Sequence, residues 1–402
     1  MKRSGSADLP LHYGHVPVWL AERMGKLGLA VVETIASEFS PAEVVAKLSD
    51  PFWFQSLGAV MGMDWHSSGI TTSVMGALKK SINPHSKELG VYICGGKGKQ
   101  SLKTPDELLK VGDRTGLDGV NLGNCSKLSA KVDNTAIQDG FQLYLHSFIV
   151  SVSGEWAVVQ QGMNPNSKTA RRYHWHSENL QSFVSEPHSF IYGQNQGKIL
   201  NFTDKKAVEV RDNSVEISRE DPVKILREIT HLKMPAHHEV RIEDVNLKRL
   251  GAMLWLTHEK QPEDFESLLL LKGMGPRALQ SLALVSEVIY GSPSRFDDPA
   301  RFSFAHGGKD GHPFPVPTKI YDETINTLQI AIQKSKLGNS DKLDAIRKLS
   351  EISLQAEKDF IPNTNFDALI RNEREESHKY GGRTIFGKAV PPDNPNGQLK
   401  LF

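Results

Sequence analysis

A glycine-rich stretch near residue 310, HGGKDGH, holds the densest set of ionisable side chains in the chain. Histidine can move protons near neutral pH, and lysine can act as a nucleophile or clamp a phosphate. Aspartate can orient either group or hold a metal ion. We therefore identify His306, Lys309 and Asp310 as candidate catalytic residues. The alternative is a turn that Asp310 stabilises through the local backbone.

A second set of candidates lies in the middle of the chain. Asp139 follows an expected helix over 126–138 and precedes two apolar stretches that predict a β-hairpin turning near residues 153–154. An aspartate followed by a strand with a glutamine pair at its end partly matches the core of restriction-type nucleases, which hold Mg²⁺ or Mn²⁺, although the lysine of that pattern is missing. The sequence does not show which residues would bind the metal ion. The candidate catalytic residues here are Asp139, Gln161 and His174.

Arg171 and Arg172 open a run of basic and aromatic residues, RRYHWH. Basic side chains bind phosphates, and aromatic side chains between them can stack on bases. We therefore predict that both arginines contact nucleic acid. The alternative is a strand at the edge of the core whose arginine side chains extend to solvent.

Glycines and lysines alternate in GGKGK, residues 95–99, directly after a short buried strand expected over 91–94. Such a loop can cradle a phosphate, with Lys97 and Lys99 adding positive charge. It is not a P-loop, because the required spacing and the Lys-Ser/Thr pair are absent. We therefore expect no nucleotide cofactor. A basic surface loop without a ligand is the alternative.

The stretch 262–291, PEDFESLLLLKGMGPRALQSLALVSEVIYG, predicts two helices joined by a sharp turn. Pro262 is expected in the first turn of the first helix. Gly273 and Gly275 can take backbone angles closed to other residues, and their amides lie where a helix N-terminus favours an anion. The stretch resembles the helix-hairpin-helix motif, which grips a DNA phosphate without reading sequence. An ordinary glycine-capped helix corner is the alternative. The candidate phosphate-binding residues are Lys272, Gly273, Gly275 and Arg277.

The chain ends in QLKLF after a linker rich in proline and glycine, VPPDNPNG. This end resembles the short motif by which bacterial polymerases and mismatch-repair proteins dock on the sliding clamp. The resemblance implies that the clamp is a partner, bound through Gln398, Leu399, Leu401 and Phe402. The alternative is that the two last residues pack back on the folded body.

The elements that must position these residues predict an α+β domain over 1–221 and an all-α domain over 222–378 that carries the helix-hairpin-helix. A flexible tail over 379–402 follows. In the first domain, helices are expected over 18–38 and 41–49, while 181–221 is expected to hold strands and polar loops. In the second domain, the expected helices are 222–232, 244–258, 319–336 and 340–359.

Composition limits the possible classes of protein. The chain has 402 residues, 39% of them hydrophobic, which is typical of a globular protein of two or three domains. Its net charge of +1 means that DNA binding must come from local patches. No apolar run reaches membrane-spanning length and no signal peptide is recognised, so we expect a cytoplasmic protein without membrane contact.

Several unusual motifs occur in order along residues 1 to 330: RSGSADLPLHYGHVPVWL, DPFWFQ, GGKGK, DGFQLY, AVVQQGMN, ARRYHW and FSFAHGGKDGHPFPV. Together they resemble a prokaryotic family of unknown function. The resemblance implies no activity, so the expected function depends on the motifs.

The motifs favour a DNA-processing enzyme of repair or replication, either a nuclease or a lesion-processing hydrolase. In helix-hairpin-helix glycosylases a lysine follows the hairpin and an aspartate comes some twenty residues later. Arg277 takes the lysine position here, and Asp297 or Asp298 lies near the aspartate position. One alternative is a non-catalytic DNA-binding adaptor. Another is an enzyme that acts on a nucleotide or other small phosphorylated substrate.

Overall fold

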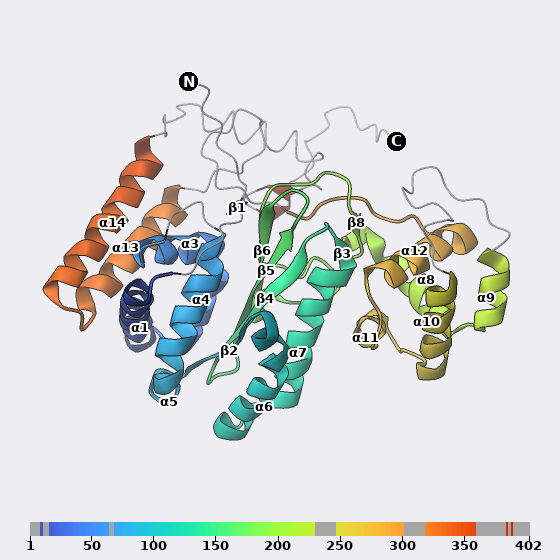
Figure 1. The fold of residues 1–402 in the computed structure, drawn as a ribbon, viewed down its shortest axis with the longest axis horizontal. Helices are drawn as coiled ribbons and strands as arrows, with labels where there is room; N and C mark the ends of the chain where they lie inside the picture. The colour runs from blue at the N-terminus through green and yellow to red at the C-terminus, as the bar shows by residue number, and fades with distance from the viewer. Residues whose placement is uncertain are drawn as a thin grey trace, which may run out of the picture.

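The computed structural model describes residues 9–10, 16–63, 68–229, 247–300, 318–358, 383–384 and 387–388 (Figure 1). Its centre is an antiparallel sheet in the order β1-β6-β5-β4-β2, with β7 also paired to β6. The predicted hairpin is present, because β4 and β5 pair directly and turn at Ser153 and Gly154. The strands of this sheet are β1 (Leu9–Pro10), β2 (Val91–Lys97), β4 (Gln142–Ser151), β5 (Trp156–Asn164), β6 (Thr169–His176) and β7 (Phe190–Tyr192).

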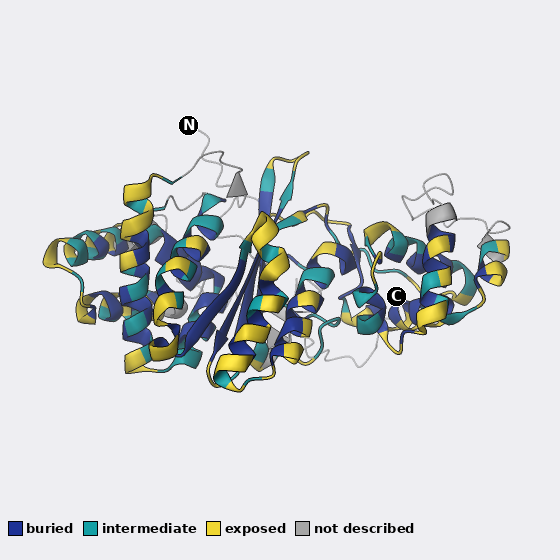
Figure 2. Ribbon diagram, turned by 60° about the horizontal axis from the view of Figure 1, so that its bottom comes forward, coloured by how far each residue is buried: buried dark blue, intermediate teal, exposed yellow. Residues whose placement is uncertain are grey.

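Both faces of the sheet are covered by helices, and Figure 2 shows its strands as mostly buried. Side chains of successive residues in a strand point to opposite faces. In β2, Val91 and Ile93 accordingly join one hydrophobic core, whereas Tyr92 and Cys94 join the other. The sheet therefore separates two cores.

Helices α1 (Val18–Glu38), α2 (Pro41–Ser49), α3 (Pro51–Val60) and α4 (Gly69–Ile82) build the first core. The predicted α1 and α2 are confirmed. Ser40 caps α2 by accepting a hydrogen bond from the Glu43 amide at 3.0 Å, and Asp50 caps α3 in the same way. A proline at the first position of α2 and of α3 suits the helix start, since the amide there has no partner within the helix.

The packing of α13 (Thr318–Lys334) and α14 (Asn339–Lys358) differs from the expected domain division. Both were expected in an all-α domain over 222–378, but they pack on α1 and α3 at the far end of the molecule (Figure 1). Leu328 and Ile332 enter the first core, and Arg23 pairs with Asp341 at 3.0 Å. The apolar faces of these helices pack into the first core, and this packing determines where the helices lie.

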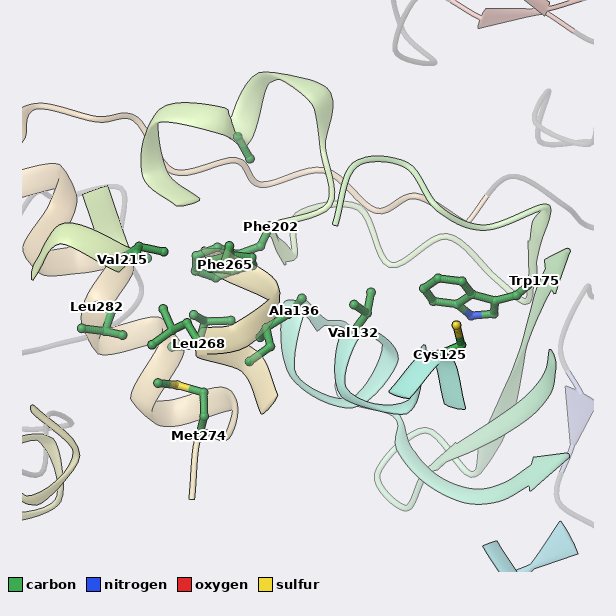
Figure 3. Close-up of a cluster of buried hydrophobic side chains, with 14 of the residues drawn as sticks. Cys125, Val132, Ala136, Trp175, Phe202, Val215, Phe265, Leu268, Met274 and Leu282 are labelled. Carbon is green, nitrogen blue, oxygen red and sulfur yellow. The ribbon is translucent and has the colours of Figure 1, made fainter. Parts of the chain in front are cut away.

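The second core begins on the other face of the sheet and continues into the remaining helices. Figure 3 shows it running from Trp175 through Val132 and Ala136 to Phe265 and Leu282. Because this core is continuous, residue 221 marks no break in packing. The helices on this side are α6 (Thr104–Thr115), α7 (Gly119–Lys131), α8 (Val208–Arg219), α9 (Pro222–Ile229), α10 (Leu247–Lys260), α11 (Phe265–Leu270) and α12 (Pro276–Tyr290).

Strands and loops were expected over 181–221; β7 and β8 (Leu200–Asn201) lie in this range, but its last part forms helix α8 instead. Val210, Ser214 and Ile217 are buried at helical spacing, while Glu209 and Asp212 are not. This face packs against α12, so tertiary contacts favour a helix in a polar sequence.

The remaining elements are short. They are α5 (Ser86–Leu89), the pair β3 (Ile137–Gln138) and β8 (Leu200–Asn201), and the pair β9 (Arg383–Thr384) and β10 (Gly387–Lys388). None of the described helices combines the length and the apolar character needed to span a membrane.

Candidate functional site

The two helices predicted over 262–291 are present, and a turn joins them. Helix α11 begins after Asp264 and not at Pro262, because Asp264 and Ser267 cap each other reciprocally: the Ser267 amide donates to the Asp264 carboxylate at 2.7 Å, and the Asp264 amide donates to the Ser267 hydroxyl at 3.0 Å. Helix α12 begins at Pro276. In the turn between them the Met274 side chain is buried in the second core.

Much of this turn is exposed, and several of its backbone amides lack a partner among the described residues. Lys272, Gly273 and Arg277 are exposed, and Gly275 is half-buried. The amides of Gly273, Gly275 and Arg277 have no hydrogen-bond partner among the described residues. Only Gly273 needs the freedom of glycine, with φ at +94°, since Gly275 has an ordinary extended φ of −134°. The turn can therefore present several N–H groups and two cations to one anion.

Two side chains, one at the end of α7 and one in β3, hold the turn in place. The Lys131 ammonium donates to the Met274 carbonyl oxygen at 2.6 Å, and the Gln138 amide donates to the Pro276 carbonyl oxygen at 2.8 Å. Partial burial lowers the pKa of Lys131. Lys127, one turn earlier on α7, is exposed. The turn therefore lies against a basic stretch of the neighbouring helix.

In the glycine-rich stretch 95–99, where a phosphate cradle is predicted, the first glycine already has another partner. The first residues of this stretch continue strand β2. The Gly95 amide already donates to the Glu107 carboxylate at 2.7 Å, and Lys79 neutralises that carboxylate at 2.7 Å. The Gly95 amide is therefore not free to bind a phosphate. Lys97 and Lys99 are exposed, which leaves them as basic surface residues.

Asp139 and Arg171 come together, but inside the protein. Arg171 forms ion pairs with Asp139 at 2.8 Å and with Asp298 at 2.7 Å, and all three side chains are fully buried. Tyr173 also donates to Asp139, at 2.6 Å. Burial lowers the pKa of Arg171, but the two carboxylates raise it above its ordinary value. The prediction that Arg171 contacts nucleic acid is therefore wrong for this structure. Asp298, considered above as a glycosylase-type aspartate, is buried in an ion pair that links the segment after α12 to β6.

Gln161, Arg172 and His174 gather on the opposite face of the sheet, also without exposure. Arg172 and Gln161 are directly paired across β5 and β6, so their side chains share one face. The Arg172 Nε donates to His174 Nε2 at 2.8 Å. Burial, together with the charge of Arg172, holds the pKa of His174 well below its usual range. Arg172 therefore cannot make the surface DNA contact that the sequence predicts.

A buried network of polar side chains surrounds Asp133, and the sequence does not predict it. The network runs Ser126–His146–Gln160–Asp133–His188, and Trp175 also donates to Asp133 at 3.0 Å. Gln160 donates its amide to Asp133 at 2.5 Å and accepts from His146 Nδ1 at 2.8 Å, so His146 Nε2 accepts from the Ser126 hydroxyl. No spacing in the sequence indicates this network, because its members come from five separate segments.

The Asp133 network joins α7 to the sheet. Ser126 and His146 are both buried, and burial lowers the pKa of His146 to about 4. Asp133 lies in a π-helical turn, Val132–Ala136, that continues α7. Fully satisfied polar networks of this kind fix the packing of one element on another. A structural role accounts for the contacts seen.

The remaining candidates lie outside the described residues. These are His306, Lys309, Asp310, Gln398, Leu399, Leu401 and Phe402. Among the residues that the structure does describe, no group of three histidine, cysteine or acidic side chains is arranged to hold a metal ion. Binding of Mg²⁺ or Mn²⁺ stays a prediction.

Comparison with known proteins agrees with the family resemblance seen in the motifs. A family model described as "Protein of unknown function (DUF763)" matches residues 5–316. The chain belongs to this family. The match includes the sheet, the turn between α11 and α12 and the HGGKDGH stretch. Neither curated proteins nor solved structures gave a match to the chain.

Proposed function

We propose that the chain binds the phosphate backbone of DNA through the turn between α11 and α12. The observation that supports this most is the exposed turn from Lys272 to Arg277, in which unpaired amides lie between two exposed cations. Amides at a helix N-terminus bind a phosphate without reading a base. The binding is therefore expected to be independent of sequence.

The surroundings of the turn favour a rigid binding site. Lys131 and Gln138 bond to the carbonyl groups on either side of Gly275, and the Met274 side chain is anchored in the core. A site held in its binding geometry loses little conformational entropy when the ligand arrives. The Lys131 ammonium also brings a third positive charge to the turn.

The charge reversal Arg277→Glu tests this proposal. We expect it to weaken duplex binding by about 1 kcal/mol or more and to reduce the salt slope of log K by about one unit. Arg347→Glu is the matched control, because Arg347 is also exposed but lies on α14 at the other end of the molecule (Figure 1). Equal binding by the two variants would remove the turn from the proposal.

We further propose that DNA binding serves a DNA-processing hydrolase of repair or replication, with His306, Lys309 and Asp310 as its reactive groups. Labelled single-stranded, duplex, nicked and lesion-bearing DNA, with and without Mg²⁺ or Mn²⁺, tests for strand or base release. Lys309→Ala is expected to lower turnover about a hundredfold without a change in melting temperature. Binding without release would favour the adaptor.

Recruitment by the sliding clamp is the last part of the proposal, and it depends on the sequence QLKLF at the chain end. A tail peptide is expected to bind the clamp with micromolar affinity, about −8 kcal/mol, with Leu401 and Phe402 as anchors. Fluorescence polarisation with the wild-type peptide and with a peptide in which both anchors are alanine measures this. Equal signals from the two peptides would contradict the proposal.

A further inference from the structure

Arg171 and Arg172 are consecutive in β6 and equally buried, yet their electrostatic surroundings differ. Arg171 lies between the carboxylates of Asp139 and Asp298. Arg172 points to the other face of the sheet and has no carboxylate partner among the described residues. A buried charge without an opposite charge is strongly unfavourable in a protein interior. Among the described residues, Arg172 therefore has no negative group beside it.

The hydrogen bonds of Arg172 leave part of the guanidinium unused. Its Nε donates to His174 at 2.8 Å, but Nη1 and Nη2 make only long contacts of 3.4 Å, to the Thr71 hydroxyl and the Pro51 carbonyl oxygen. A guanidinium carries five N–H donors, so two have no acceptor among the described residues. One unused donor belongs to Nη1 and the other to Nη2, the two nitrogens at the end of the guanidinium, which we call its Nη edge. Two such donors can bind an oxyanion together.

Two aromatic rings lie close to the Arg172 guanidinium. The guanidinium carbon lies 4.8 Å from the centre of the Phe54 ring and 5.0 Å from that of Tyr192. Aromatic rings stabilise the cation but cannot accept its in-plane hydrogen bonds as an oxyanion does. Next to it, Gln161 has an amide oxygen that is buried and unpaired, while its nitrogen donates to the Ser68 carbonyl oxygen at 2.9 Å. That oxygen can accept a hydrogen bond from a hydroxyl group of a ligand.

We propose that the Nη edge of Arg172, with Thr71 and Gln161 beside it, binds the oxyanion of a small molecule, namely a phosphate or a carboxylate group. The ligand is small because the three side chains are completely buried. It differs from the DNA phosphate of the α11–α12 turn, since Arg172 faces the first core while that turn packs against the second. The Arg172 site therefore does not depend on the proposed DNA contact.

Thermal unfolding of the full chain tests the site. Sodium phosphate, sodium sulfate and sodium acetate are titrated separately, each against sodium chloride at equal ionic strength. A ligand that binds only the folded protein raises its melting temperature with the logarithm of ligand concentration. A saturable rise with phosphate or sulfate identifies a phosphate-type ligand, and a rise with acetate alone identifies a carboxylate. No rise with any of the three anions overturns the proposal.

The variant Arg172→Met assigns the effect to this residue. Its melting temperature without added anion is expected to be no lower than that of the wild type, because an unpaired buried charge is replaced by an apolar chain of similar length. Its apparent Kd for the active anion is expected to rise at least about tenfold, since the charged, two-donor contact is lost. An unchanged Kd in this variant overturns the proposal.

A second variant keeps the test decisive if Arg172→Met does not fold. Arg172→Lys retains the charge but loses the planar pair of Nη donors. Weaker anion-dependent stabilisation in Arg172→Lys supports the site, and full stabilisation contradicts it. DNA binding, which depends on the α11–α12 turn, is the control readout and is expected to be the same in both variants and the wild type.

Discussion

The Lys131 ammonium lies 2.6 Å from the main-chain carbonyl oxygen of Met274, although the two residues are 143 positions apart in the chain. This contact joins α7, which packs on the sheet, to the turn that we propose as the DNA contact. Lysine has three N–H donors, and Met274 takes one. Lys131 can therefore hold the turn and contact a bound phosphate at the same time.

Lys131→Met is expected to weaken DNA binding by about 1 kcal/mol, because the turn loses both a hydrogen bond and a positive charge. Stability to urea is expected to fall by about 1 kcal/mol as well. Lys127→Met is the control, since Lys127 is exposed one turn earlier on α7 and is expected to change stability by less than about 0.5 kcal/mol. Wild-type DNA affinity in Lys131→Met would contradict the role given to this lysine.

Gly275→Val is expected to weaken DNA binding with little loss of stability, whereas Gly273→Ala is expected to lower stability. A Cβ at Gly275 meets nothing closer than the Gly273 carbonyl oxygen at 4.0 Å, and the extended backbone accepts valine, so unfolding free energy should fall by about 1 kcal/mol or less. Its methyl groups would cover the free amides and raise the Kd for DNA about tenfold. Urea unfolding and fluorescence anisotropy with labelled duplex measure the two effects.

In Gly273→Ala the left-handed backbone, with φ at +94°, strains the turn. We expect stability to fall by about 1–2 kcal/mol. Equal DNA affinity in Gly275→Val and the wild type would show that the Gly275 amide does not face the phosphate.

Arg171→Met is expected to lower the free energy of unfolding by about 3–5 kcal/mol, because Asp139 and Asp298 would stay buried without their cation. Equilibrium unfolding in urea measures it. Arg172→Met serves as the comparison, since Arg172 has no carboxylate partner among the described residues. Similar stability in the two variants would contradict the asymmetry between these neighbouring arginines.

His146 is expected to make the protein less stable in mild acid. Burial lowers its folded pKa from 6.5 to about 4, so between these values the unfolded chain binds a proton that the folded chain does not. The stability from neutral His146 is therefore fully present above pH 6.5 and is lost as pH falls towards 4, by about 3 kcal/mol in all.

Urea unfolding of wild type and His146→Gln at several pH values measures this effect. The variant is expected to be less stable than wild type near neutral pH, because it disturbs the hydrogen bonds to Ser126 and Gln160. Its stability should depend less on pH between 6.5 and 4. Parallel pH profiles for the two proteins would show that His146 is not the titrating group.

Local sequence signals determined many of the elements. Ser40 and Pro41 mark the start of α2, and the β-hairpin follows from two apolar stretches on either side of Ser153 and Gly154. The turn between α11 and α12 follows from its glycines and from apolar positions at helical spacing. These features depend on residues close together in the chain, which explains why they can be predicted from one sequence.

Only the tertiary structure decided which polar residues reach solvent. RRYHWH has the composition of a nucleic-acid contact, but the sheet is covered on both faces, so Arg171 and Arg172 are buried on opposite sides of it. Arg171 pairs with Asp139 and also with Asp298, which is 127 residues away, and the Asp133 network joins five separate segments. Composition gives the chemistry of a side chain, but packing between distant segments sets its exposure and its partners, and these decide whether it binds a ligand or stabilises the fold.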